Sequence, residues 1–306
     1  MSTADIVARI GRLRKERNAV ILAHNYQRGE VQDVADFVGD SLGLSQQAAQ
    51  TSAEVIVFCG VHFMAETAKI LSPQKTVLLP DLHAGCPMAD MLTKRELLEF
   101  KAQHPGALTV AYVNCSAEIK AEADVCCTSA NALKVVESLP AGREVLFVPD
   151  QSLGDYVQRQ TKRRMILWGG YCPTHHRFLR RDVDAMRAAH PQALLCVHPE
   201  CTRDIVDLAD FAGSTSQIIR FCRASEAQEF IIGTEGGILH TLARENPQKR
   251  FQHLSPLGDC PNMKLITLEK VLWSLEDMRY EITLDEELRR RAETAVRAML
   301  SVSAAP

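Results

Sequence analysis

Short apolar runs rich in β-branched residues alternate along the whole chain with stretches of helical periodicity. Several of these runs are continuously apolar, as in strands that are covered on both faces, and helical stretches of roughly 8 to 20 residues lie between them. The alternation predicts an α/β fold of parallel sheets flanked by helices. The predicted strands are Ala19–Ala23, Val55–Phe58, Thr76–Leu79, Leu108–Val113, Val125–Thr128, Val145–Val148, Met165–Trp168, Leu194–Val197, Phe211–Gly213, Phe230–Gly233 and Phe251–Leu254.

The two ends of the chain are predicted to be helical. Residues 1–17 have the pattern of an amphipathic helix, and its apolar face is predicted to contain Ile6, Val7, Ile10 and Leu13. Near the other end, Lys264–Tyr280 and Leu284–Val302 are predicted as two helices with no strand between them. The second opens on Thr283-Leu284-Asp285-Glu286, which has the pattern of a capping box.

Three cysteines recur at nearly equal spacing, and each is followed by a proline. The pairs Cys86-Pro87, Cys172-Pro173 and Cys260-Pro261 lie 86 and 88 residues apart, and none of the other seven cysteines precedes a proline. Such recurrence predicts three repeated segments. The alternative is that Cys-Pro only marks the first turn of a helix, but this does not account for a cysteine at each of the three places.

Two further series run in step with the cysteines. Three predicted strands end in His24, Tyr112 and His198, at intervals of 88 and 86 residues. Thr128-Ser129 and Gly213-Ser214 then each follow a short strand, whereas Gly39-Asp40-Ser41 is expected to fall inside a longer gap of the first segment. We therefore expect the repeat to hold in outline and to break down in detail there.

Three repeats around a pseudo-threefold axis would point three equivalent loops at one centre, since functional loops lie at the carboxyl ends of parallel strands. Thiolates at helix N-termini would lie in a positive field that favours ionisation. A structural zinc ion wants four ligands, with His175 or His198 as candidates for the fourth. An iron–sulfur cubane on three cysteines leaves one iron open as a Lewis acid. Softness of the ligands favours the cluster, but zinc and a metal-free enzyme stay open.

The strand ends carry mostly neutral donors, which with helix N-terminal amides suit a phosphate or a carboxylate. Glu200 is the one carboxylate among them and hence the first candidate for a general acid or base. Ser129 and Ser214 have an alternative role as helix caps. Gly233-Thr234-Glu235-Gly236-Gly237 looks like an anion-cradling turn, although a plain glycine-rich turn accounts for it equally well.

Composition narrows the class of protein. The chain has 306 residues, enough for two or three domains, and a net charge of −3 that gives no reason to expect nucleic acid. Neither a P-loop nor a G-x-G-x-x-G motif is present. No apolar stretch is long enough for a membrane span, and the start lacks the order of a signal peptide, so we expect a cytoplasmic protein. Ten cysteines in such a protein do not indicate disulfides; Cys126, Cys127 and Cys201 are expected to be packing residues.

As a set, the motifs resemble the quinolinate synthase family from about Ala19 to Met263. They are His24-Asn25-Tyr26-Gln27, Gly39-Asp40-Ser41, Gly85-Cys86-Pro87-Met88, Tyr112-Val113-Asn114, Thr128-Ser129-Ala130-Asn131, Gly169-Gly170-Tyr171-Cys172-Pro173-Thr174-His175, His198-Pro199-Glu200-Cys201, Gly213-Ser214-Thr215, Gly233-Thr234-Glu235 and Cys260-Pro261-Asn262-Met263. The resemblance implies that iminoaspartate and dihydroxyacetone phosphate condense to quinolinate, with loss of phosphate and two waters, in NAD biosynthesis. It also implies three αβα sandwich domains around a pseudo-threefold axis.

The resemblance further implies a division into 1–85 plus 261–306, 86–171 and 172–260, with the active site at their junction. It implies a [4Fe-4S] cluster on Cys86, Cys172 and Cys260, and a functional link to an aspartate oxidase or dehydrogenase. The residues implied to hold carboxylate or phosphate groups are His24, Ser41, Ser129, His198, Ser214 and Thr215. Tyr26, Tyr112 and Asn114 would orient the intermediate, and Glu200 would transfer protons. Some members have a C-x-x-C pattern at the last ligand. Here the position of the second cysteine, three residues after Cys260, is Met263, which argues against a thiol–disulfide switch there.

Overall fold

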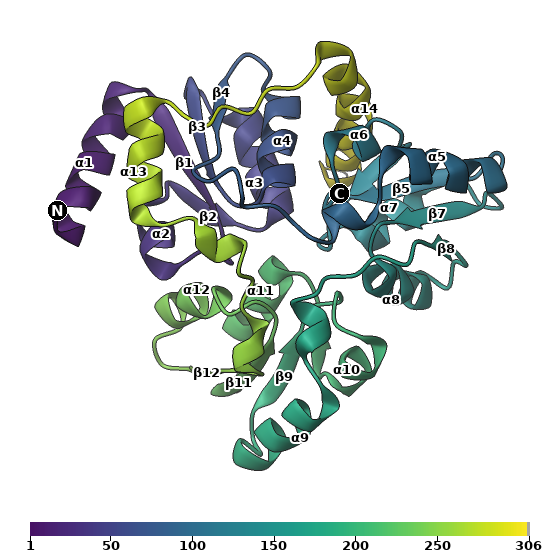
Figure 1. The fold of residues 1–306 in the computed structure, drawn as a ribbon. Helices are drawn as coiled ribbons and strands as arrows, with labels where there is room; N and C mark the ends of the chain where they lie inside the picture. The colour runs from purple at the N-terminus through teal and green to yellow at the C-terminus, as the bar shows by residue number, and fades with distance from the viewer. Residues whose placement is uncertain (305–306) are drawn as a thin grey trace.

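The computed structural model describes residues 1–304 and contains three four-stranded sheets, all parallel. The strand order is the same in each sheet: second, first, third and fourth in chain order. Figure 1 shows the three units arranged around a common centre. The chain is therefore an α/β protein of three αβα sandwich domains, and the predicted fold class is confirmed.

Each sheet is built from strands that follow one another along the chain. The first consists of β1 (Ala19–His24), β2 (Phe37–Gly39), β3 (Val55–Cys59) and β4 (Thr76–Leu78). The second consists of β5 (Leu108–Tyr112), β6 (Val125–Cys127), β7 (Val145–Val148) and β8 (Ile166–Leu167). The third consists of β9 (Leu194–Val197), β10 (Phe211–Ala212), β11 (Glu229–Gly233) and β12 (Arg250–His253). Every predicted strand is present, with ends that differ by one residue at most; β2 alone was not predicted.

Strand β2 corrects the expectation that the first segment departs from the repeat. It pairs with β1 at the sheet edge, with Gly39 beside His24, and is too short and too exposed to stand out as an apolar run. Strand β2 ends two residues before Ser41, just as β6 ends two residues before Ser129. The interval from His24 to Ser41 is 17 residues, the same as from Tyr112 to Ser129, so the third series is complete.

Helices cover the sheets. The first unit has α1 (Thr3–Glu16), α2 (Gly29–Val34), α3 (Ser41–Gln50) and α4 (His62–Leu71). The second has η1 (Ala89–Met91), α5 (Lys94–Gln103), α6 (Ala117–Lys120), α7 (Ala132–Ser138) and α8 (Gln151–Thr161). The third has η2 (His175–Arg177), α9 (Arg180–Ala189), α10 (Arg203–Leu208), α11 (Thr215–Ala224), α12 (Ile238–Glu245) and η3 (Pro256–Gly258). The chain ends with η4 (Met263–Leu265), α13 (Leu268–Asp277) and α14 (Glu286–Ala304).

The terminal helices connect the units. Helix α13 packs against α1, α2 and β3 of the first unit, whereas α14 lies against α4 and also against α6, α7 and β6 of the second. The division into 1–85 plus 261–306, 86–171 and 172–260 stays a prediction. Within residues 1–304, the helices are too short or too polar to cross a membrane.

Two details of the terminal helices differ from the prediction. In α1, Ile6 and Ile10 are buried but Val7 is 40% exposed, because the face that contacts the protein is narrower than the apolar pattern. At the start of α14 the expected capping box is absent. The carboxylate of Asp285, the residue immediately before α14, instead accepts the Leu288 N–H and caps the helix.

The interior of each sheet is apolar and closed. All residues of β3 and β7 are buried, including Phe58 and Phe147. Burial of one such side chain contributes roughly 1.5–3 kcal/mol, so the strands are held rigidly between their helices. The polar residues at the carboxyl ends of the strands are therefore placed accurately with respect to one another.

Candidate active site

A cavity of about 680 Å³ lies where the carboxyl ends of the first strands of the three sheets meet. All three cysteines of the Cys-Pro pairs line it, so the sequence correctly predicted that they converge. The cavity is also lined by these predicted site residues: His24, Tyr26, Ser41, Tyr112, Asn114, Ser129, His198, Glu200 and Thr215. Ser214 is not among the lining residues.

Each Cys-Pro pair opens a tight helical turn: η1, η2 or η4. In each turn the cysteine carbonyl accepts the N–H four residues on, from Asp90, His176 and Lys264 respectively. The sulfur in turn receives the backbone N–H three residues on, from Ala89, His175 and Met263. The Cys-Pro pairs do start helical turns, and the turns aim three sulfur atoms at one cavity.

Burial raises the pKa of the Cys86 thiol to about 12, and it raises the pKa of Cys172 and Cys260 as well. The backbone N–H groups lower these pKa values by less than burial raises them. The helix N-termini do favour ionisation, as expected, but desolvation outweighs their effect. The thiols require a bound cation to become thiolates.

The spacing of the three sulfur atoms bears on whether they could bind a single zinc ion. Cys86 interacts with the charges of both Cys172 and Cys260, so the three are neighbours. Four-coordinate zinc, with Zn–S bonds of about 2.3 Å, holds its sulfurs about 3.8 Å apart. Within residues 1–304, Cys172, His175 and Glu200 are the one set of three potential ligands whose atoms all lie within 4.8 Å of one another. At least one pair of the three cysteine sulfurs is therefore more than 4.8 Å apart, wider than a single zinc ion holds them.

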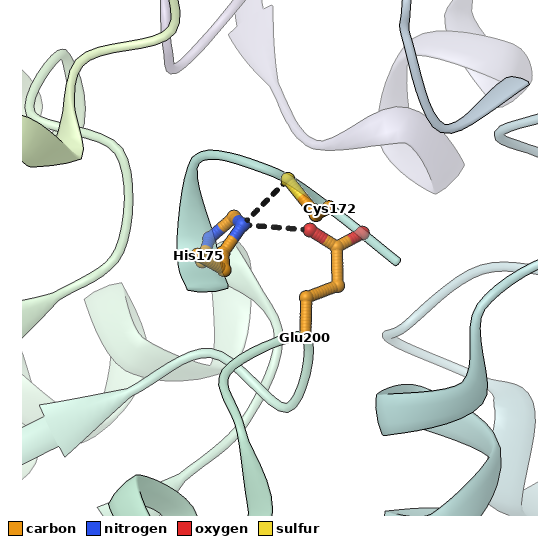
Figure 2. A group of neighbouring side chains, drawn as sticks. All are labelled: Cys172, His175 and Glu200. Carbon is orange, nitrogen blue, oxygen red and sulfur yellow. Dashed lines mark hydrogen bonds and ion pairs between the residues drawn. The ribbon is translucent and has the colours of Figure 1, made fainter. Parts of the chain in front are cut away.

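Glu200 is buried and surrounded by donors. Its carboxylate accepts from Tyr112 Oη at 2.7 Å and from Asn114 Nδ2 at 3.3 Å. His175 Nδ1 lies 2.8 Å from the other oxygen and 3.1 Å from Cys172 Sγ, as Figure 2 shows. Burial raises the pKa of Glu200, but the adjacent imidazoles of His175 and His198 and the hydrogen bonds from His175 and Tyr112 outweigh it and hold the pKa below its usual value. Glu200 is therefore an ionised carboxylate that is able to accept a proton.

A continuous chain of hydrogen bonds leads to this carboxylate. Thr215 Oγ1 donates to Tyr26 Oη at 3.0 Å, and Tyr26 Oη lies 2.5 Å from Thr234 Oγ1. Thr234 Oγ1 lies 2.9 Å from His175 Nε2. Since His175 Nδ1 donates to Glu200, its Nε2 accepts from Thr234, which then accepts from Tyr26. Every donor in this chain points toward Glu200.

The two strand-end histidines share one local geometry. His24 Nδ1 accepts the Tyr26 N–H and His198 Nδ1 accepts the Glu200 N–H, each at 3.2 Å. Burial lowers the pKa of both imidazoles to about 3, so both are neutral. With Nδ1 an acceptor, Nε2 carries the proton. His198 Nε2 donates to Ser129 Oγ at 3.1 Å, which leaves the Ser129 hydroxyl hydrogen free for a ligand.

The cavity is suited to anions without using cationic side chains. In the described part of the chain, its lining includes no Lys or Arg. Helices α3 and α11 begin at Ser41 and Thr215, so their N-terminal amides face the cavity. Nearby Lys264 lies 2.8 Å from Glu235 and is neutralised by it. An anion here would be held by hydroxyls, imidazoles and backbone dipoles, as the sequence predicted.

The two serines with alternative roles separate clearly. Ser214 accepts the Gln217 N–H in a capping box at the start of α11, and its side chain is buried. Ser129 caps no helix, because α7 begins at Ala132 with Asn131 before it. The structure thus shows a cap role for Ser214 and a cavity position for Ser129, and the binding of a substrate group by either hydroxyl stays a prediction.

The glycine-rich segment Gly233–Gly237 forms part of the contact between the third unit and the first. Glu235 accepts the Cys260 N–H at 3.0 Å, and the Gly237 carbonyl accepts from Gln32 at 2.9 Å. A Cβ atom on Gly237 would lie 2.6 Å from the Tyr26 carbonyl carbon. The absence of a side chain at Gly237 thus lets the third unit approach the first beside the cavity.

Gly237→Ala is expected to lower the free energy of unfolding by about 1–3 kcal/mol, the usual cost of overpacking. The added methyl group meets backbone atoms, which do not move aside as a side chain would. Thermal unfolding under anaerobic conditions measures the change. Gly11→Ala in α1 is the matched control, since its Cβ would meet nothing within 4 Å. Equal melting temperatures for the two variants would contradict the close approach.

Sequence reasoning missed two residues of the site. His175 was considered only as a zinc ligand, yet it contacts both Cys172 and Glu200. Thr234 was part of a weak glycine-rich signal, yet it contacts Tyr26 and His175. One available signal was that the residue three after the cysteine is apolar in the other repeats, Ala89 and Met263, but is a histidine here.

Comparison with known proteins gives full-length matches. The family described as "NadA: Quinolinate synthetase A protein" matches residues 8–301. A "Quinolinate synthase" of Geobacter metallireducens is 56% identical over 302 residues, covering 99% of both chains. "Quinolinate synthase 1" of Methanosarcina acetivorans is 53% identical with the same coverage. A "Quinolinate synthase" of Dehalococcoides mccartyi is 54% identical over 99% of this chain and 100% of the relative.

Proposed function

The chain belongs to the quinolinate synthase family, and from that premise we propose that it condenses iminoaspartate with dihydroxyacetone phosphate to quinolinate. Phosphate and two water molecules are lost in this reaction, which supplies the pyridine ring of NAD. The observation that carries the proposal is the convergence of three thiols, an ionised Glu200 and neutral anion-binding donors on one cavity. Both substrates are small anions, which suits that donor set.

We infer that Cys86, Cys172 and Cys260 hold a [4Fe-4S] cluster. Their spacing, wider than a single zinc ion requires, and their need for a cation to ionise support this inference. A cubane held by three cysteines would supply one open iron that acts as a Lewis acid toward a substrate oxygen. A metal-free sugar-phosphate enzyme is the alternative, but it leaves three buried thiols facing the cavity without a role.

The residues of the chain supply binding and proton transfer. His24, Ser41, Ser129, His198 and Thr215 would donate to the carboxylate and phosphate groups of the substrates. Tyr26 and Tyr112 would fix the condensing intermediate through their hydroxyls, which hydrogen bond on the route to Glu200. Glu200 would take the proton that is lost in each dehydration. Asn114, with one amide oxygen that lacks a partner among the described residues, would orient the intermediate.

Iron and zinc analysis tests the cofactor. We expect anaerobically purified protein to be brown, with about four irons per chain, the content of one cubane, and with no stoichiometric zinc. An absorption spectrum recorded with an EPR spectrum of the reduced protein identifies the cluster type. One zinc and no iron per chain would refute the assignment. Quinolinate formation that survives iron chelation would favour the metal-free alternative.

Ser129→Ala is expected to raise KM or lower kcat by roughly tenfold, the effect of losing about one hydrogen bond to a charged group. The melting temperature should stay the same, because Ser129 caps no helix. Steady-state kinetics and thermal unfolding of the same preparation measure the two effects. Ser116→Ala is the control and should show the reverse pattern, since its hydroxyl caps α6 and Ser116 does not line the cavity. Unchanged kinetics with a lower melting temperature for Ser129→Ala would exclude a role in binding.

The supply of iminoaspartate requires a second enzyme, because an imine of this kind hydrolyses in water. We propose that an aspartate oxidase or dehydrogenase supplies it, since oxidation of the aspartate amine is the direct route to the imine. Cytoplasmic location likewise stays a proposal from the sequence.

A further inference from the structure

A second pocket, of about 590 Å³, lies on the first unit away from the active-site cavity. Residues 280–282 run antiparallel to β4, and the Tyr280 carbonyl accepts the Leu79 N–H at 3.0 Å. The pocket lies between this segment, the chain that follows β4 and the C-terminal half of α13.

Three large hydrophobic side chains are exposed around this pocket: Leu82, Trp273 and Tyr280, at 48%, 47% and 40%. A lone exposed apolar side chain needs no explanation, but a group of them around one hollow indicates a binding surface. Trp and Tyr present flat faces suited to stacking on a planar ring. The walls of the pocket thus favour an aromatic ligand.

The polar groups of the pocket favour an anion. The guanidinium of Arg279 lies 5.6 Å from the Tyr280 ring centre and pairs with Asp277 at 2.9 Å, with its side chain 52% exposed. One ion pair leaves other N–H groups of the guanidinium free to donate. Lys270 contributes no further charge, because it lies 2.5 Å from Asp81, which also lines the pocket. The exposed imidazole of His83 adds a second available donor.

A buried group in the pocket also lacks a partner. Ser274 lines the pocket and is only 2% exposed, yet its hydroxyl has no hydrogen-bond partner among the described residues. Buried hydroxyls are nearly always paired. The wall of the pocket therefore contains a polar group that the described residues leave unsatisfied.

We propose that this pocket binds a flat aromatic anion, stacked on Trp273 and Tyr280 with its negative group on Arg279. A ligand there would rest on the chain that leads to Cys86, since Pro80–His83 line the pocket and Asn262 beside Cys260 donates to the Gly85 carbonyl at 2.8 Å. Only the choice of probe rests on the proposed function: pyridine carboxylates are the chemical class of the reaction product. A free pyridine dicarboxylate and a pyridine nucleotide share this chemistry.

Calorimetry on the anaerobic, cluster-loaded enzyme tests the proposal, with quinolinate and nicotinate mononucleotide as separate probes. At least one probe is expected to bind at a site that Trp273→Ala weakens tenfold or more and Arg279→Gln weakens severalfold. Trp273→Tyr should restore most of the affinity. Succinate, with the same carboxylates but no ring, should not bind there. Which probe binds more tightly identifies the source of the ligand.

Fluorescence gives an independent readout, because the chain has only two tryptophans. Binding should quench emission in the wild type and leave the remaining Trp168 emission of Trp273→Phe unchanged. Binding isotherms that are identical in the wild type, Trp273→Ala and Arg279→Gln would overturn the proposal. The exposed apolar side chains of the pocket would then be better explained by contact with a macromolecule. Turnover by these variants should equal that of the wild type. If the wild type itself made no quinolinate, that result would refute the proposed function without bearing on this pocket.

Discussion

Cys172→Ala is expected to lose the cluster and quinolinate formation together. Cys172 interacts both with another of the three cysteines and with the hydrogen-bonded groups around Glu200. Its sulfur interacts with that of Cys86, and His175 Nδ1 lies 3.1 Å from it. With Cys172 replaced, two cysteines remain, and two thiolates do not hold a cubane against loss to solvent. We expect iron to fall from about four per chain to below one, and turnover to fall by at least about a thousandfold, because the Lewis acid is lost with the cluster.

Cys59→Ala is the matched control, because Cys59 is also a buried free thiol but lies within β3 and outside the cavity. It should retain iron and turnover while losing some stability from the cavity left in the core. Iron content, the absorption spectrum and quinolinate formation are measured on anaerobic preparations of both variants. A Cys172→Ala protein that kept its iron and its activity would show that the three sulfurs do not hold one common group.

The sequence predicted the fold well because its signals are local and repeated. The strands β3 and β7 are buried along their whole length, so their residues had to be continuously apolar. The Cys-Pro pairs recur because each opens the same turn, with the cysteine carbonyl bonded to the N–H four residues on. Strand β2 escaped detection because a three-residue edge strand with half-exposed side chains leaves no such pattern.

The contacts across the domain junction could not be predicted in the same way. Tyr26 and Thr234 are 208 residues apart in sequence, yet their hydroxyls lie 2.5 Å from each other. Tyr112 of the second unit donates to Glu200 of the third at 2.7 Å, although 88 residues separate them. Periodicity places a residue on a strand or helix, but the pairing of side chains from different units depends on how the units pack.

The ionisation of the cysteines shows the same limit. The position of each sulfur at the start of a helical turn suggested a lowered pKa, and the backbone N–H groups do act in that direction. The depth of burial decides the outcome, however, and burial raises the pKa of Cys86 to about 12. Burial is a property of the assembled domains, so the direction of the local effect could be predicted from the sequence but the net pKa shift could not.

Glu200→Gln is expected to keep the cluster but lose at least a hundredfold in kcat, the range for a single general acid–base group. Gln has the same shape and an oxygen that still accepts from Tyr112, so the cavity should keep its structure. Its amide is not basic, however, and the chain of donors from Thr215 through Tyr26, Thr234 and His175 would end on a group that takes no proton.

Two measurements separate proton transfer from a structural role. The iron content and spectrum of Glu200→Gln should match the wild type, whereas kcat falls and the binding of the product quinolinate, measured by calorimetry, changes little. Glu66→Gln is the control, since Glu66 is likewise buried but accepts the Ala117 N–H outside the cavity, and it should retain kcat. A near-normal kcat for Glu200→Gln would remove Glu200 from the chemistry. The four groups that donate toward it would then serve only to hold the domain junction together.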